Sequence, residues 1–139
     1  MRTDALLSLL GKASTEQLDA VVAQPVLCEL LLGELRERIP KRLRVESAYG
    51  INVTVHLRLL PFTDAEVVHA FYLTVRDARC TISDATAAYA DVVITATVVD
   101  FLKVISSRMT AVLLLAQGRI SVRGDYRDAL RVLRCFDLA

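Results

Sequence analysis

Strict alternation of apolar and polar residues marks three stretches in the middle of the chain. Every odd position from 51 to 59 is apolar, and the residues between them, Asn52 to Arg58, are polar. The same period of two returns from 71 to 76 and from 79 to 83, on either side of Asp77 and Ala78. Successive side chains of a strand point to opposite faces, so each stretch predicts a half-buried strand. Together they predict an antiparallel sheet with a tight hairpin at Asp77-Ala78 and one face that helices must cover.

Two helices are predicted before this sheet. Ser14 and Gln17 have the spacing of a capping box, in which each side chain bonds the other residue's backbone N–H. Pro25 suits the first turn of a second helix, which Pro40 would interrupt. We expect the apolar face of this second helix to pack in the core, with a lid or a dimer contact as the alternatives. That face consists of Val26, Leu27, Leu30, Leu31 and Leu35, and is enlarged by Leu32.

After residue 90 a strand and two helices are predicted in succession. The strand runs from 91 to 97 and ends at Thr97, whose hydroxyl can cap the helix that follows. Apolar residues at helical spacing form one face of this helix, with Phe101 near its centre. A second helix around 111–116 has almost no polar side, so it is either a plain core helix or a helix that faces a ligand.

A fifth strand and a last helix complete the pattern. The strand turns Ile120 and Val122 inward, between polar neighbours. Gly124 permits a turn, and the carboxylate of Asp125 can cap the last helix. The apolar face of that helix consists of Tyr126, Ala129, Leu130, Leu133 and Phe136.

Composition and charge limit the classes of function. The chain has 139 residues, of which 54% are hydrophobic, and this length suits one domain with a single core. Its 17 basic residues are interleaved with 16 acidic ones, so the long-range field needed to collect nucleic acid is missing. The densest basic run, from Arg36 to Arg44, is interpreted as the solvated end of a helix, and a docking patch for anionic membrane is the alternative.

The sequence carries no pattern typical of a cofactor, metal or catalytic site. Its glycines are scattered and form no phosphate loop, and His56 and His69 are too few for a metal centre. Cys28, Cys80 and Cys135 are expected to be buried free thiols of a reducing, cytoplasmic compartment. Cys135 follows a basic residue, but we expect that neighbour to point to the opposite, solvated face. We therefore expect no cofactor, no metal and no enzymatic activity.

Short signals between Ala90 and Phe136 resemble, in their order and spacing, the C-terminal half of sterol carrier protein type-two domains. The signals are Ala-Asp-Val-Val-Ile-Thr-Ala-Thr at 90–97, Asp-Phe-Leu at 100–102, Ala-Gln-Gly-Arg-Ile-Ser-Val-Arg-Gly-Asp at 116–125 and Ala-Leu at 129–130. The resemblance implies a domain from 25 to 139, with residues 1–24 as an N-terminal helical extension. It also implies an α+β fold, in which a five-stranded mixed, largely antiparallel sheet has helices packed on one face and encloses an apolar tunnel.

The resemblance further implies where a ligand would lie. In this family the corresponding helices and the inner sheet face enclose a tunnel for fatty acyl chains, acyl-CoA or sterols. On the helices, the residues carried over as tunnel lining are Phe101, Leu102, Ile105, Met109, Val112, Leu113 and Ala116. The sheet and the last helix add Leu73, Ile94, Ile120, Leu130, Leu133 and Phe136.

The leading hypothesis is a non-enzymatic carrier of a lipid or another hydrophobic metabolite. The first alternative is an accessory module that presents an apolar substrate to a partner enzyme. A second alternative is a small enzyme in which Tyr89 or Asp91 acts on a ligand in the pocket. A third is a structural homodimer whose seam is the face from Leu27 to Leu35.

Overall fold

A computed structural model of the chain describes residues 5–84, 89–106 and 109–136. The strands are β1 (Val53–Leu60), β2 (His69–Arg76), β3 (Arg79–Ser83), β4 (Val92–Thr97) and β5 (Ser121–Gly124). The helices are α1 (Ala5–Lys12), α2 (Thr15–Val22), α3 (Pro25–Arg38), α4 (Val45–Ala48), α5 (Val98–Ile105), α6 (Ala111–Ala116) and α7 (Tyr126–Arg134), with a 3-10 turn η1 (Ile39–Arg42) after α3. The predicted α+β fold is confirmed.

The strands form one mixed sheet in the order β3-β2-β1-β4-β5. β1 lies at the centre, antiparallel to β2 and parallel to β4, and the other neighbouring pairs are antiparallel. The odd residues of β1 are buried and the even ones half-buried, which confirms the period of two. On the open face, the His56 and Tyr72 rings stack with centroids 4.3 Å apart, and the Thr54 and Thr74 hydroxyls lie 3.1 Å apart.

The predicted hairpin joins β2 to β3. Asp77 and Ala78 have φ values of 53° and 57°, both in the left-handed region. Two successive left-handed residues give the turn whose twist matches that of the flanking strands. Neither residue is glycine, so each costs about 1 kcal/mol that the strand pairing must offset.

The N-terminal helices are part of the core. The capping box of α2 is formed as predicted: the Ser14 N–H donates to Gln17 Oε1 at 2.8 Å, and the Gln17 N–H donates to Ser14 Oγ at 3.0 Å. Leu7 and Leu10 of α1, and Leu18 of α2, are buried. Both helices pack against α5. Residues 5–22 therefore add a layer to the fold and shield the side of α5 that faces away from the sheet.

α3 packs with a different face from the predicted one. Cys28, Leu32 and Leu35 are buried, while Val26 and Leu30 are 70% and 62% exposed. Apolar residues occupy nearly every side of this helix, so their spacing did not determine which face is buried. Cys28 lies at the centre of the buried face. The predicted core face is wrong at its exposed members, which are Val26, Leu27 and Leu30. Leu35, at the end of the face predicted as a possible dimer seam, is fully buried, whereas Leu27 and Leu30 on that face are exposed.

The basic run from Arg36 to Arg44 makes contacts within the molecule. Arg36 forms an ion pair with Asp84 at 2.8 Å, and Arg38 forms one with Glu34 at 2.6 Å. The Arg44 guanidinium donates to a backbone carbonyl in the last turn of α7 at 2.9 Å. These contacts support the interpretation of the run as the end of a helix.

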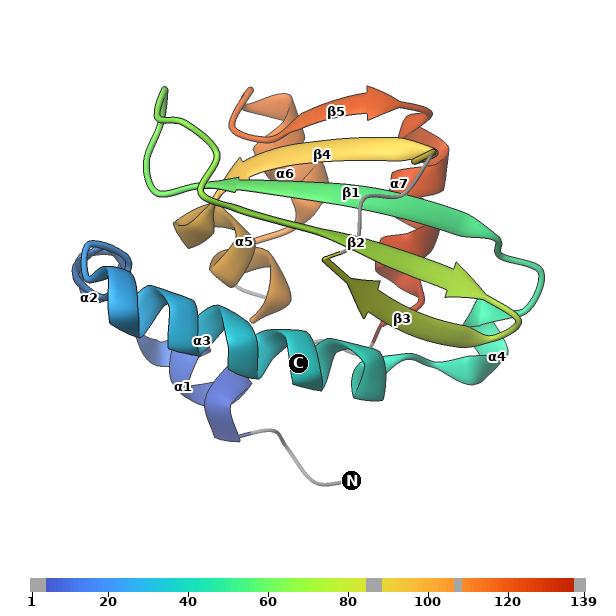
Figure 1. The fold of residues 1–139 in the computed structure, drawn as a ribbon, viewed down its shortest axis with the longest axis horizontal. Coiled ribbons are helices and arrows are strands. Elements are labelled where there is room, and N and C mark those ends of the chain that lie inside the picture. The colour runs from blue at the N-terminus through green and yellow to red at the C-terminus, as the bar shows by residue number, and fades with distance from the viewer. Residues whose placement is uncertain (1–4, 85–88, 107–108, 137–139) are drawn as a thin grey trace.

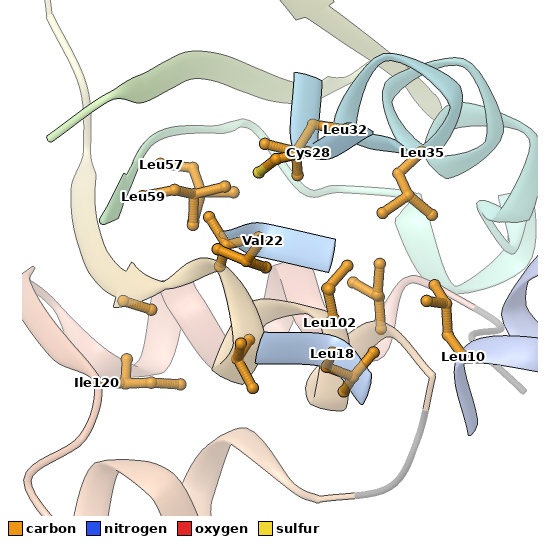
Figure 2. Close-up of a cluster of buried hydrophobic side chains, with 14 of the residues drawn as sticks. Leu10, Leu18, Val22, Cys28, Leu32, Leu35, Leu57, Leu59, Leu102 and Ile120 are labelled. Atoms are coloured by element: carbon orange, nitrogen blue, oxygen red, sulfur yellow. The ribbon is translucent and has the colours of Figure 1, made fainter. Parts of the chain in front are cut away.

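All helices that cover the sheet lie on one of its faces. Figure 1 shows α6 and α7 partly behind the strands and α5 below their left ends, with α1 and α2 at the lower left and α3 running from there toward the centre. Buried apolar side chains form two core clusters. The first joins α1, α2, α3 and α5 to the Leu57 and Leu59 end of β1, as Figure 2 shows. The second joins η1 and α7 to Val53 and Val55 at the other end of β1.

Candidate functional site

An apolar cavity of about 150 Å³ lies where the two core clusters meet. The sheet supplies its floor, α5 one wall, and α6 and α7 the cover. Its lining residues are Ile39, Val55, Leu57, Leu73, Ile94, Ala96, Phe101, Val104, Ile105, Ala111, Val112, Leu115, Ile120, Val122, Tyr126, Ala129, Leu130, Val132, Leu133 and Phe136. Among these residues Tyr126 alone carries a polar side-chain atom.

The cavity opens between α6 and the start of α7. Val112 and Tyr126 line it and are nevertheless 55% and 51% exposed, so they stand at its mouth. Leu114 is the one buried residue of α6, and Val132 is the one buried residue of α7. Helices held by so few buried side chains are the parts of a fold that move most readily. The cover of the cavity is therefore its least firmly packed part.

Most of the predicted lining residues border this cavity. They are Leu73, Ile94, Phe101, Ile105, Val112, Ile120, Leu130, Leu133 and Phe136. The other predicted residues lie elsewhere. Leu102 is fully buried in the first core cluster, and Met109 packs against that cluster. Leu113 is 46% exposed, and Ala116 is exposed as well, on the outer side of α6.

Several residues that line the cavity were not predicted from the sequence as ligand-binding residues. Val55 and Leu57 point inward from β1 and border the cavity. The period of two predicted that they face inward, but they were not assigned to a ligand site. Val104 lies one helical turn from the predicted Phe101, and Leu115 lies one turn from the predicted Val112. On α6 the carried-over set placed Leu113 and Ala116 beside Val112, whereas Ala111 and Leu115 border the cavity with it. Helical spacing groups residues on one face and does not say which face meets the cavity.

An ion pair between the buried Asp100 of α5 and the half-exposed Arg119, just before β5, ties the wall formed by α5 to the sheet. Asp100 is 1% exposed, and Arg119 Nη2 lies 2.9 Å from its Oδ1. Arg119 Nε donates to Oδ2 at 3.2 Å, whereas Oδ1 has no aligned hydrogen-bond donor. The Asp100 N–H in turn donates to Thr97 Oγ1, which caps α5 as predicted. The Asp125 carboxylate likewise caps α7 by accepting from the Arg127 N–H at 2.8 Å.

No catalytic arrangement is found among the described residues. Tyr89 is 71% exposed and Asp91 accepts a hydrogen bond from the Thr54 N–H at 2.8 Å, and neither borders the cavity. The alternative of an enzyme built on these two residues therefore lacks a site. Cys135 is 1% exposed and its Sγ donates to the Arg131 carbonyl, while burial raises the pKa of its thiol.

One cysteine and histidine contact was not foreseen. Cys28 Sγ lies 3.8 Å from His69 Nε2, between α3 and β2. Burial raises the pKa of the Cys28 thiol, which disfavours the reactive thiolate. In the described ranges no group of three or more His, Cys, Asp or Glu side chains could hold a metal ion, and no helix is long and apolar enough to cross a membrane.

A family model matches most of the chain. The model of the SCP-2 sterol transfer family matches residues 33–137, which include every strand and the whole lining of the cavity. The chain belongs to the SCP-2 sterol transfer family. No curated protein sequence matches it.

Solved structures share the fold at low sequence identity. The sec-alkylsulfatase Pisa1 from Pseudomonas sp. is 19% identical over 74% of the chain, with a TM-score of 0.63, and the chain spans 16% of that enzyme's length. Sterol Carrier Protein-2 like-3 from Aedes aegypti is 21% identical over 76% of the chain and 92% of its own length, with a TM-score of 0.57. UbiJ-SCP2, a ubiquinone synthesis protein, is 13% identical over 77% of the chain and 88% of its own length, with a TM-score of 0.57.

Proposed function

We propose that this protein binds and carries a lipid or another hydrophobic metabolite in the cavity between the sheet and α5, α6 and α7, without chemical conversion. The observation that carries the proposal is an apolar lining contributed by both core clusters, with its mouth at α6 and α7. Membership in the SCP-2 sterol transfer family supports it. A cavity whose described lining has one polar side chain, that of Tyr126 at the mouth, can select a ligand by shape and apolar surface.

The size of the cavity limits what it holds in this conformation. A cavity of about 150 Å³ lined by aliphatic and aromatic side chains accommodates a molecule such as benzene. About six carbons therefore fit, and their burial contributes about 5 kcal/mol at roughly 0.8 kcal/mol per methylene before the cost of association is subtracted. A longer chain requires α6 and α7 to move apart, or it leaves its remainder at the mouth beside Tyr126.

A fluorescence titration tests the proposal. The probe is a fatty acid with a terminal dansyl group, kept below its micellar concentration. We expect saturable binding with a stoichiometry of one. Leu130→Asp places a carboxylate in the half-buried cavity wall and should weaken binding at least about tenfold, because a charge there must be desolvated when the ligand enters. Leu30→Asp, on the exposed side of α3, is the matched control and should bind as the wild type. Absence of saturable binding by the wild-type protein would refute the proposal.

A second candidate is a module that presents its ligand to a partner enzyme. Two of the structural relatives favour it: the fold forms 16% of the sulfatase Pisa1, and UbiJ-SCP2 is named as a ubiquinone synthesis protein. Both candidates require the same cavity, so the titration does not separate them. A stable complex with an enzyme encoded beside this protein, isolated at physiological salt, would favour the second candidate.

A further inference from the structure

α3 carries two rows of residues with the same spacing on opposite sides of the helix. Cys28, Leu32 and Leu35 form the first row, which is buried in the core. The second row, at 26, 30 and 33, is exposed and continues to the exposed residue 37. Each row has a spacing of four and then three residues, the repeat that forms a seam between two helices. At about 100° per residue the rows lie on nearly opposite sides of α3, so the second row faces outward.

The outward row combines large apolar side chains with a glycine. Val26 and Leu30 are 70% and 62% exposed. Gly33 follows in the interior of the helix, where glycine is less favourable than alanine. A Cβ at this position would meet no atom within 4 Å, so packing among the described residues does not require a glycine here. The missing side chain allows the backbone of another helix to approach closely, and Gly33 therefore marks a point at which a second helix can cross α3.

We propose that a second copy of the chain packs on the outer surface of α3, defined by Val26, Glu29, Leu30, Gly33 and Glu37, with the two α3 helices antiparallel and crossing at Gly33. Two-fold symmetry brings the same surface of both copies together. Val26 and Leu30 of each copy then pack beside the C-terminal half of the other α3. In Figure 1 α3 runs below β2 and β3, whereas α6 lies behind the upper strands, so the dimer leaves the mouth of the cavity open.

The sign of the charge changes along this part of the chain. Residues 13–34 contain four acidic residues and no basic one, whereas residues 35–44 contain five basic residues and one acidic residue. A parallel pair of α3 helices would bring the acidic parts of both copies together, and like charges across an interface are unfavourable. An antiparallel pair places the acidic part of each copy beside the basic part of the other. Charge therefore favours a second copy in the antiparallel arrangement.

The charges that can act between copies are those without a partner in their own chain. Arg36 and Arg38 already have carboxylate partners within the molecule. Glu29 and Lys41 are exposed and form no ion pair within residues 5–84, 89–106 and 109–136. In the antiparallel dimer Glu29 of one copy and Lys41 of the other lie on the same side of the crossing, about 6 Å apart along the helix axis. Their long side chains span that separation, so we expect them to pair.

Sedimentation equilibrium of the purified protein, without added ligand, tests the dimer directly. α3 has 14 residues, and one pair of such helices buries less surface than a standard stable interface. We therefore expect a dimer with a Kd of about 10–100 μM that dissociates on dilution. Val26→Asp should raise this Kd by at least about tenfold, because the carboxylate must be desolvated in the interface. Val68→Asp makes the same change at a valine that is 56% exposed just before β2, and should dimerise as the wild type.

Gly33→Leu distinguishes a helix crossing from a merely adhesive surface. Leucine favours the helix and has open space at this position, so the urea midpoint of the dilute variant should be at least that of the wild type. On an adhesive surface the added apolar side chain would strengthen association. At a helix crossing it holds the two backbones apart and should raise the Kd of the dimer by at least about tenfold. Association as strong as that of the wild type, or stronger, would overturn the crossing at Gly33.

Charge reversal tests the antiparallel arrangement. Glu29→Lys and Lys41→Glu each place like charges opposite one another and should raise the Kd by about fivefold. The variant that carries both substitutions restores opposite charges at both ends of the interface and should recover the wild-type Kd. Failure to recover it would overturn the antiparallel pairing. Circular dichroism of every variant checks that it is folded.

The dimer and ligand carriage are tested independently. A mass equal to that of the monomer up to about 300 μM would overturn the dimer and leave the proposed function standing. A mass that rises beyond that of the dimer would also overturn the proposal, because a two-fold contact closes at two copies. Dimerisation that Val26→Asp abolishes, in a protein that takes up no fatty acid probe, would support the dimer and refute carriage. Leu30→Asp should be monomeric and still take up the probe, since its α3 lies away from the cavity mouth.

Discussion

Filling the cavity from α7 should abolish ligand binding and stabilise the fold. Ala129 lies at the middle of the lining arc of α7 and is half-buried, so Ala129→Phe directs a phenyl ring into the space. The cavity of about 150 Å³ is of the size that holds benzene, so one ring occupies most of it. At about 24 cal/mol per Å³, leaving that volume empty costs about 3.6 kcal/mol. Rotamer strain and the open mouth reduce the gain, and we expect the free energy of unfolding to rise by about 1–2 kcal/mol.

Two assays and one control decide this prediction. Urea unfolding measures the free energy, and titration with the dansyl fatty acid measures uptake. Ala116→Phe makes the same change on the exposed side of α6, outside the lining, and should leave both quantities near their wild-type values. If Ala129→Phe binds the probe with wild-type affinity, the cavity described here is not the binding site. If Ala116→Phe abolishes binding instead, the ligand binds at the outer side of α6 and not in the cavity described here.

Three further substitutions, the first with a matched control, test the supporting structure. Arg119→Met leaves the buried Asp100 carboxylate without its partner and should lower the free energy of unfolding by about 2 kcal/mol. Arg127→Met, in an exposed ion pair, should leave the urea midpoint near its wild-type value. Thr97→Ala removes the hydroxyl that caps α5 and should cost about 1 kcal/mol in the same assay; no measurable loss would mean that the cap contributes nothing. Burial raises the pKa of Cys80 to about 12 from 9.0, so the unfolded thiol ionises first. Its contribution to stability is complete below pH 9 and is lost as pH rises from 9 to about 12, so the urea midpoint should fall less steeply over that range in Cys80→Ala than in the wild type.

Elements with a strict period or a clear cap could be predicted from the sequence. The alternation around Val53 and Leu57 identified β1 and its buried face, and the same period located β2 and β3. Ser14, Thr97 and Asp125 cap helices as their spacing indicated. These strands and caps depend on residues only a few positions apart, so the interactions that cause them can be identified from the sequence.

The candidate site could be predicted only in part, because it depends on how helices are turned about their axes. α6 is apolar all round, and its spacing is the same whether Leu113 or Leu115 faces the cavity. α3 presented the same ambiguity, and the buried side proved to be that of Cys28 rather than that of Leu30. Packing against distant elements decides such cases, and a single sequence does not contain those contacts. The inward face of β1 was assigned more accurately because polar residues mark its opposite face.

The central claim is that the cavity beneath α6 and α7 carries an apolar ligand. Native mass spectrometry of the purified protein tests it most directly, followed by denaturation and identification of whatever is extracted into organic solvent. We predict an adduct of one small apolar molecule that disappears on denaturation and is missing from Ala129→Phe purified in the same way. A mass equal to that of the bare chain, unchanged after incubation with fatty acids, acyl-CoA and sterols, would contradict the claim.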